Sequence, residues 1–66
     1  MTTFKITFFD KNMDVYEVKT YHNVEDQSAM LENIETRIET LELENRVKAE
    51  GSNGKDYTRA VNYFLN

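Results

Sequence analysis

A change in the spacing of apolar residues near residue 22 constrains the fold of this chain more than any other feature. Before it, apolar and polar residues alternate, which is typical of half-buried strands. After it, apolar residues recur at helical intervals through a long stretch without Gly or Pro, which is typical of an amphipathic helix. We therefore expect an α+β fold, in which an antiparallel β-hairpin packs on one long acidic amphipathic helix.

The hairpin is predicted from two alternating segments, about residues 3–9 and 14–20. The first segment is expected to face the core with Phe4, Ile6 and Phe8, and the second with Tyr16 and Val18. Asp10 and Asn12 lie in the short polar connection, and both residue types favour turns. A hairpin with a tight turn is the expected result.

The long helix is predicted over about residues 24–49. Asn23 is suited to cap its start, and acidic residues follow in the first turn, near the positive end of the helix dipole. Its apolar seam is formed by Val24, Leu31, Ile34, Ile38 and Leu41, with Asn45 next in the series. We expect this seam to cover the hairpin, and the alternative is a dimeric coiled coil through the same residues.

The end of the chain is predicted to form a short terminal element in the same single domain, which spans residues 1–66. Two glycines within the predicted loop at residues 50–55 end the long helix. Residues 56–65 are expected to form a helix that Asp56 caps, with apolar residues on one face. The alternative is a third strand, which would strengthen a sheet of only two strands.

The sequence lacks the motifs that usually carry catalysis or metal binding. There is no Cys and one His, so a structural zinc site is not expected. Asp10, Asn12 and Asp14 have the spacing that begins an EF-hand loop, but the required Gly and Glu are replaced by Val15 and Tyr21. No Gly-rich phosphate loop and no serine nucleophile motif is present. We therefore expect no catalytic, cofactor-binding or metal-binding residues, and the chain is predicted not to be an enzyme.

The charge balance narrows the class of partner. Twelve acidic residues against eight basic ones give a net charge of −4, which disfavours direct binding to nucleic acid or to an anionic membrane. No stretch resembles a signal peptide or a membrane span, and the lack of Cys fits a reducing compartment. The sequence therefore predicts a cytoplasmic protein whose partner is another protein with a basic groove or patch, and a homodimer stays open as a further prediction.

The acidic residues of the predicted helix suggest a binding face. Residues 24–50 contain eight acidic residues and three basic ones. At about 100° per residue, five glutamates fall on one arc opposite the apolar seam: Glu25, Glu32, Glu35, Glu39 and Glu42. Neighbours in this row lie about 5–6 Å apart, which is close to the phosphate spacing of a nucleic-acid strand. A nucleic-acid mimic is therefore one hypothesis, and an ordinary solvated helix face is the alternative.

Four apolar residues are candidates for additional contacts. Leu43 and Val47 fall nearly opposite the seam, so the terminal helix covers them or they form an exposed patch. Phe9 and Tyr63 complete this set. The sequence favours a small non-enzymatic regulator or inhibitor of a larger partner, a kind of protein that viruses commonly encode. The alternative function is a self-associating domain that dimerises through its long helix.

Overall fold

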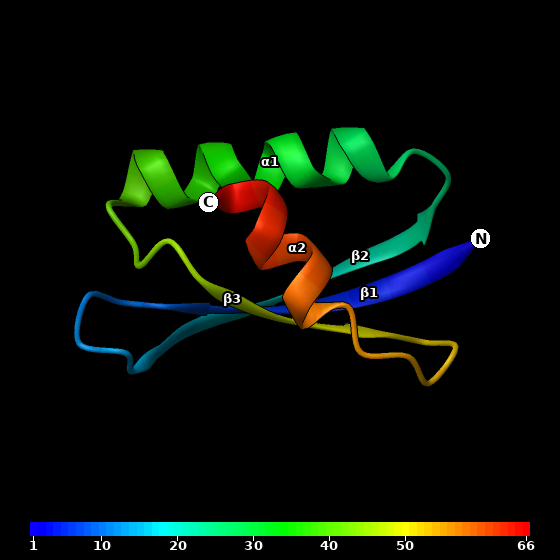
Figure 1. Cartoon of the computed structure of the whole chain (residues 1–66), viewed down its shortest axis with the longest axis horizontal. Coiled ribbons are helices and arrows are strands. Elements are labelled where there is room, and N and C mark those ends of the chain that lie inside the picture. The colour runs from blue at the N-terminus through cyan, green and yellow to red at the C-terminus, as the bar shows by residue number, and fades with distance from the viewer.

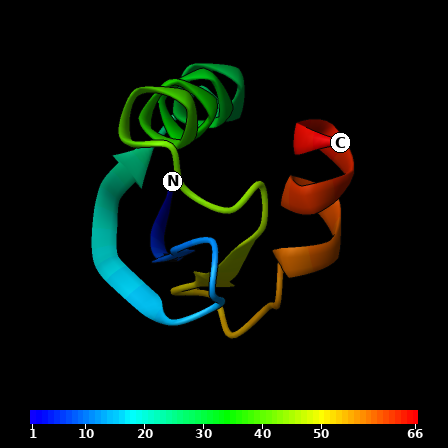
Figure 2. The ribbon, with the colours of Figure 1, turned by 90° about the vertical axis from the view of Figure 1, so that its left-hand side faces the viewer.

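The computed structural model describes all residues, 1–66, and has an α+β fold, as the sequence predicts. Its elements in chain order are β1 (Thr2–Phe9), β2 (Val15–Val24), α1 (Gln27–Leu41), β3 (Val47–Gly51) and α2 (Thr58–Leu65). The sheet has the order β2-β1-β3, and β1 is antiparallel to both of its neighbours. Both helices lie on the same side of this twisted sheet, and the other side carries no helix (Figure 1 and Figure 2).

The core lies between the central strand and the two helices. Alternation in β1 turns Phe4, Ile6 and Phe8 toward the helices, and all three are buried, as the sequence predicts. The eight other members of the core are Met30, Ile34, Ile38, Leu43, Val47, Ala49, Val61 and Leu65. Every element except β2 thus contributes buried apolar residues.

The prediction that Tyr16 and Val18 of β2 face the core is wrong. Tyr16 and Val18 are 53% and 48% exposed, whereas Glu17 is half-buried on the side of the helices. The register pairs Phe8, which faces the core, with Glu17, and an irregularity follows between Phe8 and Phe9. Because side chains alternate with a period of two, this register places the apolar residues of β2 on the open side of the sheet. β2 is an edge strand with no fully buried residue, so it tolerates apolar side chains on the open side of the sheet.

The predicted helix of residues 24–49 is too long at both ends. α1 starts after Asp26, whose carboxylate accepts the backbone N–H of Ser28 at 2.9 Å, so Asp26 and not Asn23 is the N-cap. The helix ends at Leu41, and Glu42 follows in the left-handed region with φ 54°. A third strand is present, but it is formed by Val47–Gly51 and not by residues 56–65. Pairing with β1 buries two side chains of this strand, which outweighs the helical propensity of the segment.

The predicted C-terminal helix is confirmed as α2, and its polar side chains close the outer edge of β3. The Asn62 amide donates to the carbonyl oxygen of Val47 at 3.0 Å, and its oxygen accepts the Val47 N–H at 2.9 Å. The Thr58 hydroxyl accepts the N–H of Ala49 at 3.0 Å. Gly51 donates its N–H to the carbonyl oxygen of Lys55, so the start of the predicted 50–55 loop still belongs to the strand.

The β1–β2 turn has the predicted Asx chemistry. The Asp10 carboxylate accepts the backbone N–H groups of Asn12 and Asp14 at 2.8 and 3.1 Å. A backbone hydrogen bond from Asp10 to Asp14 closes the loop. The carboxylate therefore acts as a turn-forming acceptor, as expected of Asp at this position.

Candidate functional site

The two flanks of α1 have different neighbours, and this fixes the orientation of its acidic residues. On one flank, Asn33 accepts the Tyr21 hydroxyl at 2.5 Å, and Arg37 forms an ion pair with Glu17 of β2. The Arg37 guanidinium also lies 5.6 Å from the centroid of the Phe8 ring, within cation–π range. The opposite flank, with the C-terminal glutamates, therefore faces the gap toward α2.

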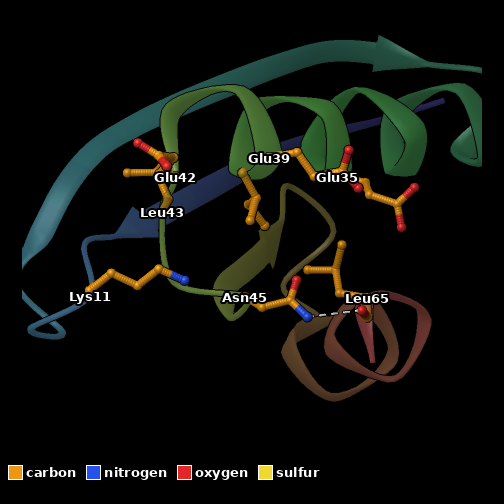
Figure 3. Close-up of a pocket in the computed structure, with 8 residues that line it drawn as sticks. Lys11, Glu35, Glu39, Glu42, Leu43, Asn45 and Leu65 are labelled. Carbon is orange, nitrogen blue, oxygen red and sulfur yellow. Dashed lines mark hydrogen bonds between the residues drawn. The ribbon is translucent and has the colours of Figure 1, made fainter.

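An open hollow of about 400 Å³ lies between the C-terminal half of α1 and the end of α2. Figure 3 shows the charged side chains around it, which are Glu35, Glu39, Glu42 and, from the hairpin turn, Lys11. The other lining residues are Ile38, Leu43, Asn45 and Leu65. Ile38, Leu43 and Leu65 are buried, so the hollow has an apolar base and a charged, mainly acidic rim. We call it the acidic hollow.

The structure divides the five predicted glutamates into two groups. Glu35, Glu39 and Glu42 line the acidic hollow, with Glu35 half-buried and the other two exposed. Glu32 is exposed one turn earlier on α1, and Glu25 precedes the helix altogether. The row on the helix is therefore shorter than predicted, because Glu25 is not part of it. At a rise of about 1.5 Å per residue, positions 32 to 42 span about 15 Å.

The four apolar candidates also separate. Leu43 and Val47 are only 3% and 2% exposed, so they are core residues and the exposed patch considered for them does not exist. Phe9 is half-buried at the end of β1, and Tyr63 is 87% exposed on α2. The error follows from the helix prediction: once the chain leaves α1 at residue 42, the helical angle no longer places later side chains.

Three lining residues of the hollow, Lys11, Asn45 and Leu65, are not predicted as site residues, because none of them belongs to α1. Lys11 belongs to the β1–β2 turn, while Asn45 precedes β3. The Asn45 amide donates to the carbonyl oxygen of Leu65 at 3.1 Å, which ties the end of α2 to this segment. No local sequence pattern indicates these contacts, since they depend on how α2 folds back over the sheet.

At the C-terminal end of α1, beside the hollow, acidic side chains interact unfavourably with the helix dipole. The C-terminal end of a helix carries partial negative charge and favours cations, yet the last turn of α1 has no basic residue. Glu39 and Glu42 place carboxylates there instead. Glu42 also adopts the left-handed conformation that Gly or Asn usually occupies at this position. Both features reduce stability, which makes these glutamates candidates for a functional role.

Replacing Glu42 by Gly is expected to raise the free energy of unfolding by about 1 kcal/mol. The change removes left-handed strain and a carboxylate at the negative helix end, and these gains exceed the added freedom of Gly in the unfolded chain. The capping hydrogen bonds of the backbone N–H of Glu42 to Glu39 and Ile38 do not need the side chain. Urea denaturation checks this, and an unchanged or lower midpoint would contradict the proposed strain.

Two groups outside the hollow have shifted pKa values. The Thr58 side chain and its backbone N–H, which donates to the carboxylate at 2.9 Å, hold the pKa of Asp56 below its usual value. Burial raises the pKa of the Tyr21 hydroxyl, and the nearby Arg37 opposes this shift. Tyr21 therefore stays protonated and continues to donate to Asn33 at neutral pH.

The structure and the comparisons with known proteins provide three further findings. No family model matches the chain, and no curated protein or solved structure matches it. Nowhere do three or more His, Asp or Glu side chains gather closely enough to bind a metal ion together. Neither helix has the length and apolar character needed to cross a bilayer. Function is therefore inferred from the geometry of the acidic hollow and its surroundings.

Proposed function

We propose that the protein is a small non-enzymatic regulator or inhibitor that binds a larger protein, and that the acidic hollow receives Lys or Arg side chains of this partner. The observation that supports this most directly is the position of Glu35, Glu39 and Glu42 around one opening at the negative end of α1. A partner's cation bound there interacts favourably with the carboxylates and with the helix dipole together.

The base of the hollow supports the same proposal. Ile38, Leu43 and Leu65 offer apolar surface to the methylene stems of Lys or Arg, whose charged ends then reach the glutamates at the rim. Lys11 is the only basic residue of the lining, so the rim stays net negative. Such an arrangement speeds association with a basic surface and makes it sensitive to salt.

Nucleic-acid mimicry is the sharper form of this proposal. In that case, the partner's basic groove normally holds DNA or RNA, and Glu32 extends the row of carboxylates beyond the hollow. The two forms differ in their need for Glu32, which does not line the hollow. A variant at Glu32 therefore separates them.

Neutralising the hollow is expected to reduce partner binding about tenfold, because each lost ion pair contributes up to about 1 kcal/mol. The variant carries Glu35→Gln, Glu39→Gln and Glu42→Gln. Its matched control carries Glu25→Gln, Glu32→Gln and Glu50→Gln, so both have the same net charge. Tagged wild-type protein and both variants are incubated with lysate at low and moderate salt, and captured proteins are quantified by mass spectrometry.

Support requires one dominant partner that wild type and control retain and that the hollow variant loses. Equal capture by all three proteins contradicts the hollow as the binding site. Equal loss from both variants shows that binding needs more than the hollow. A single Glu32→Gln variant then separates the two explanations: a large loss supports the longer row of the mimic, and a small loss means that overall charge governs binding. Circular dichroism of each variant confirms that the fold survives.

A further inference from the structure

The two edges of the sheet differ in how their backbone groups are satisfied. At the outer edge of β3, side chains of α2 bond to the backbone of Val47 and Ala49, and the backbone carbonyl of Lys55 accepts the N–H of Gly51, as described above. At the outer edge of β2, no hydrogen bond from a turn or side chain reaches the backbone of Val18 or Thr20. Figure 2 shows β2 (cyan) as the outermost strand, with no segment beyond it.

The direction of the β2 backbone groups follows from alternation along β1. Thr3 exchanges bonds with Ser52 on the β3 side, with its carbonyl accepting from Ser52 N–H at 2.8 Å. Since peptide groups alternate between the two sides of a strand, Ile6 bonds toward β2, where its partner is Lys19. The backbone N–H and C=O groups of Val18 and of Thr20 therefore point away from β1. They are free to pair with another strand.

The open side of the sheet beside this edge is unusually apolar. Tyr16 and Val18 are exposed there, and Val15 is exposed next to the register irregularity at the start of the strand. Exposed β-branched and aromatic residues next to an unpaired edge are typical of surfaces that add a strand. The sequence of β2 then decides which strand fits best.

We propose that β2 pairs with β2 of a second copy of this chain, antiparallel about a two-fold axis at Val18. The two sheets then form one continuous six-stranded sheet. In this register, Val18 exchanges both backbone hydrogen bonds with the partner's Val18, and Glu17 lies opposite the partner's Lys19. By symmetry, Lys19 lies opposite the partner's Glu17, so the interface contains two pairs of unlike charge.

Charge complementarity selects this register. A two-fold axis perpendicular to the sheet keeps each face on its own side, so the axis must pass through a residue position. An axis at Glu17 or at Lys19 places two like charges directly opposite each other, and an axis at Thr20 leaves both charges without a partner. With the axis at Val18, Tyr16 additionally faces the partner's Thr20.

The inward-facing charges of β2 explain why this pairing is selective. Charged residues on an edge strand normally discourage association, because an arbitrary strand leaves them without partners. Here the carboxylate of Glu17 already contacts Arg37 and would lie between Arg37 and the partner's Lys19. The interface is on the β2 side of α1, whereas the acidic hollow faces α2, so the inference does not rest on the proposed function.

A charge-swap experiment tests the proposal. Sedimentation velocity over a concentration series is expected to show a monomer–dimer equilibrium for the wild type. Lys19→Glu places two carboxylates opposite each other on both sides of the axis, and Glu17→Lys places two ammonium groups there. Each substitution should therefore weaken self-association roughly tenfold. An equimolar mixture of the two variants restores unlike charges and should restore the dimer.

Additional variants keep the test independent of folding defects. Glu17→Lys removes the partner of Arg37, so Val18→Lys, at an exposed side chain on the two-fold axis, provides a second disruption. Tyr63→Lys makes the same charge change at an exposed residue of α2 and should leave the dimer intact. A wild type that stays monomeric to about 1 mM overturns the proposal, even if a strand of another protein binds this edge. So does a mixture of folded charge variants that stays monomeric.

Discussion

Replacing Phe8 by Ala is expected to lower the free energy of unfolding by about 3–5 kcal/mol. Phe8 is fully buried in the central strand, and its ring lies below the Arg37 guanidinium that joins α1 to β2. The cavity left by the ring would thus also loosen the contact between these elements. A chain of this size has only about 3–10 kcal/mol of stability, so much of the variant should be unfolded at 25 °C.

The neighbouring residue provides a matched control. Phe9 has the same side chain and lies in the same strand, but it is half-buried on the opposite side of the sheet. Phe9→Ala is therefore expected to cost less than half as much. Urea denaturation followed by circular dichroism measures both variants. Equal losses would show that the core is not concentrated on the helix side of β1, contrary to the burial pattern.

The sequence pattern predicts an element correctly where one side of that element is buried in the core. β1 alternates clearly because its inward residues are entirely covered, and α1 has the buried Ile34 and Ile38 at helical spacing. The β2 strand has no comparable signal. Its apolar residues, including Val18, lie on the open side, so the same rule applied there selects the wrong face.

The end of α1 and the third strand were not predictable from local patterns. Residues 42–49 lack Gly and Pro and contain good helix formers, so they extend the helical pattern without interruption. What ends the helix is the pairing of β3 with β1, a contact between segments about 40 residues apart. The acidic hollow was half predictable for the same reason: Glu35 and Glu39 share a helix flank, whereas Lys11 and Leu65 reach the site only through tertiary structure.

Replacing Asn62 by Leu is expected to lower the free energy of unfolding by about 2–4 kcal/mol. The Asn62 amide bonds to both the N–H and the carbonyl oxygen of Val47, as a neighbouring strand would. Val47 is buried, so water does not readily replace either bond. Leu has a similar volume and a better helix propensity, so the loss reports mainly on two unsatisfied backbone groups.

Asn33→Leu provides the matched comparison, because it makes the same substitution at an exposed helical position. Asn33 accepts only the Tyr21 hydroxyl, so its loss should cost about 1 kcal/mol or less. Urea midpoints measure the difference, and hydrogen exchange at Val47 and Ala49 should become faster in the Asn62 variant alone. Equal midpoints for the two variants would mean that the outer edge of β3 does not depend on α2. If the difference is found, one helix side chain keeps this edge of the sheet closed, while the edge of β2 remains available for pairing.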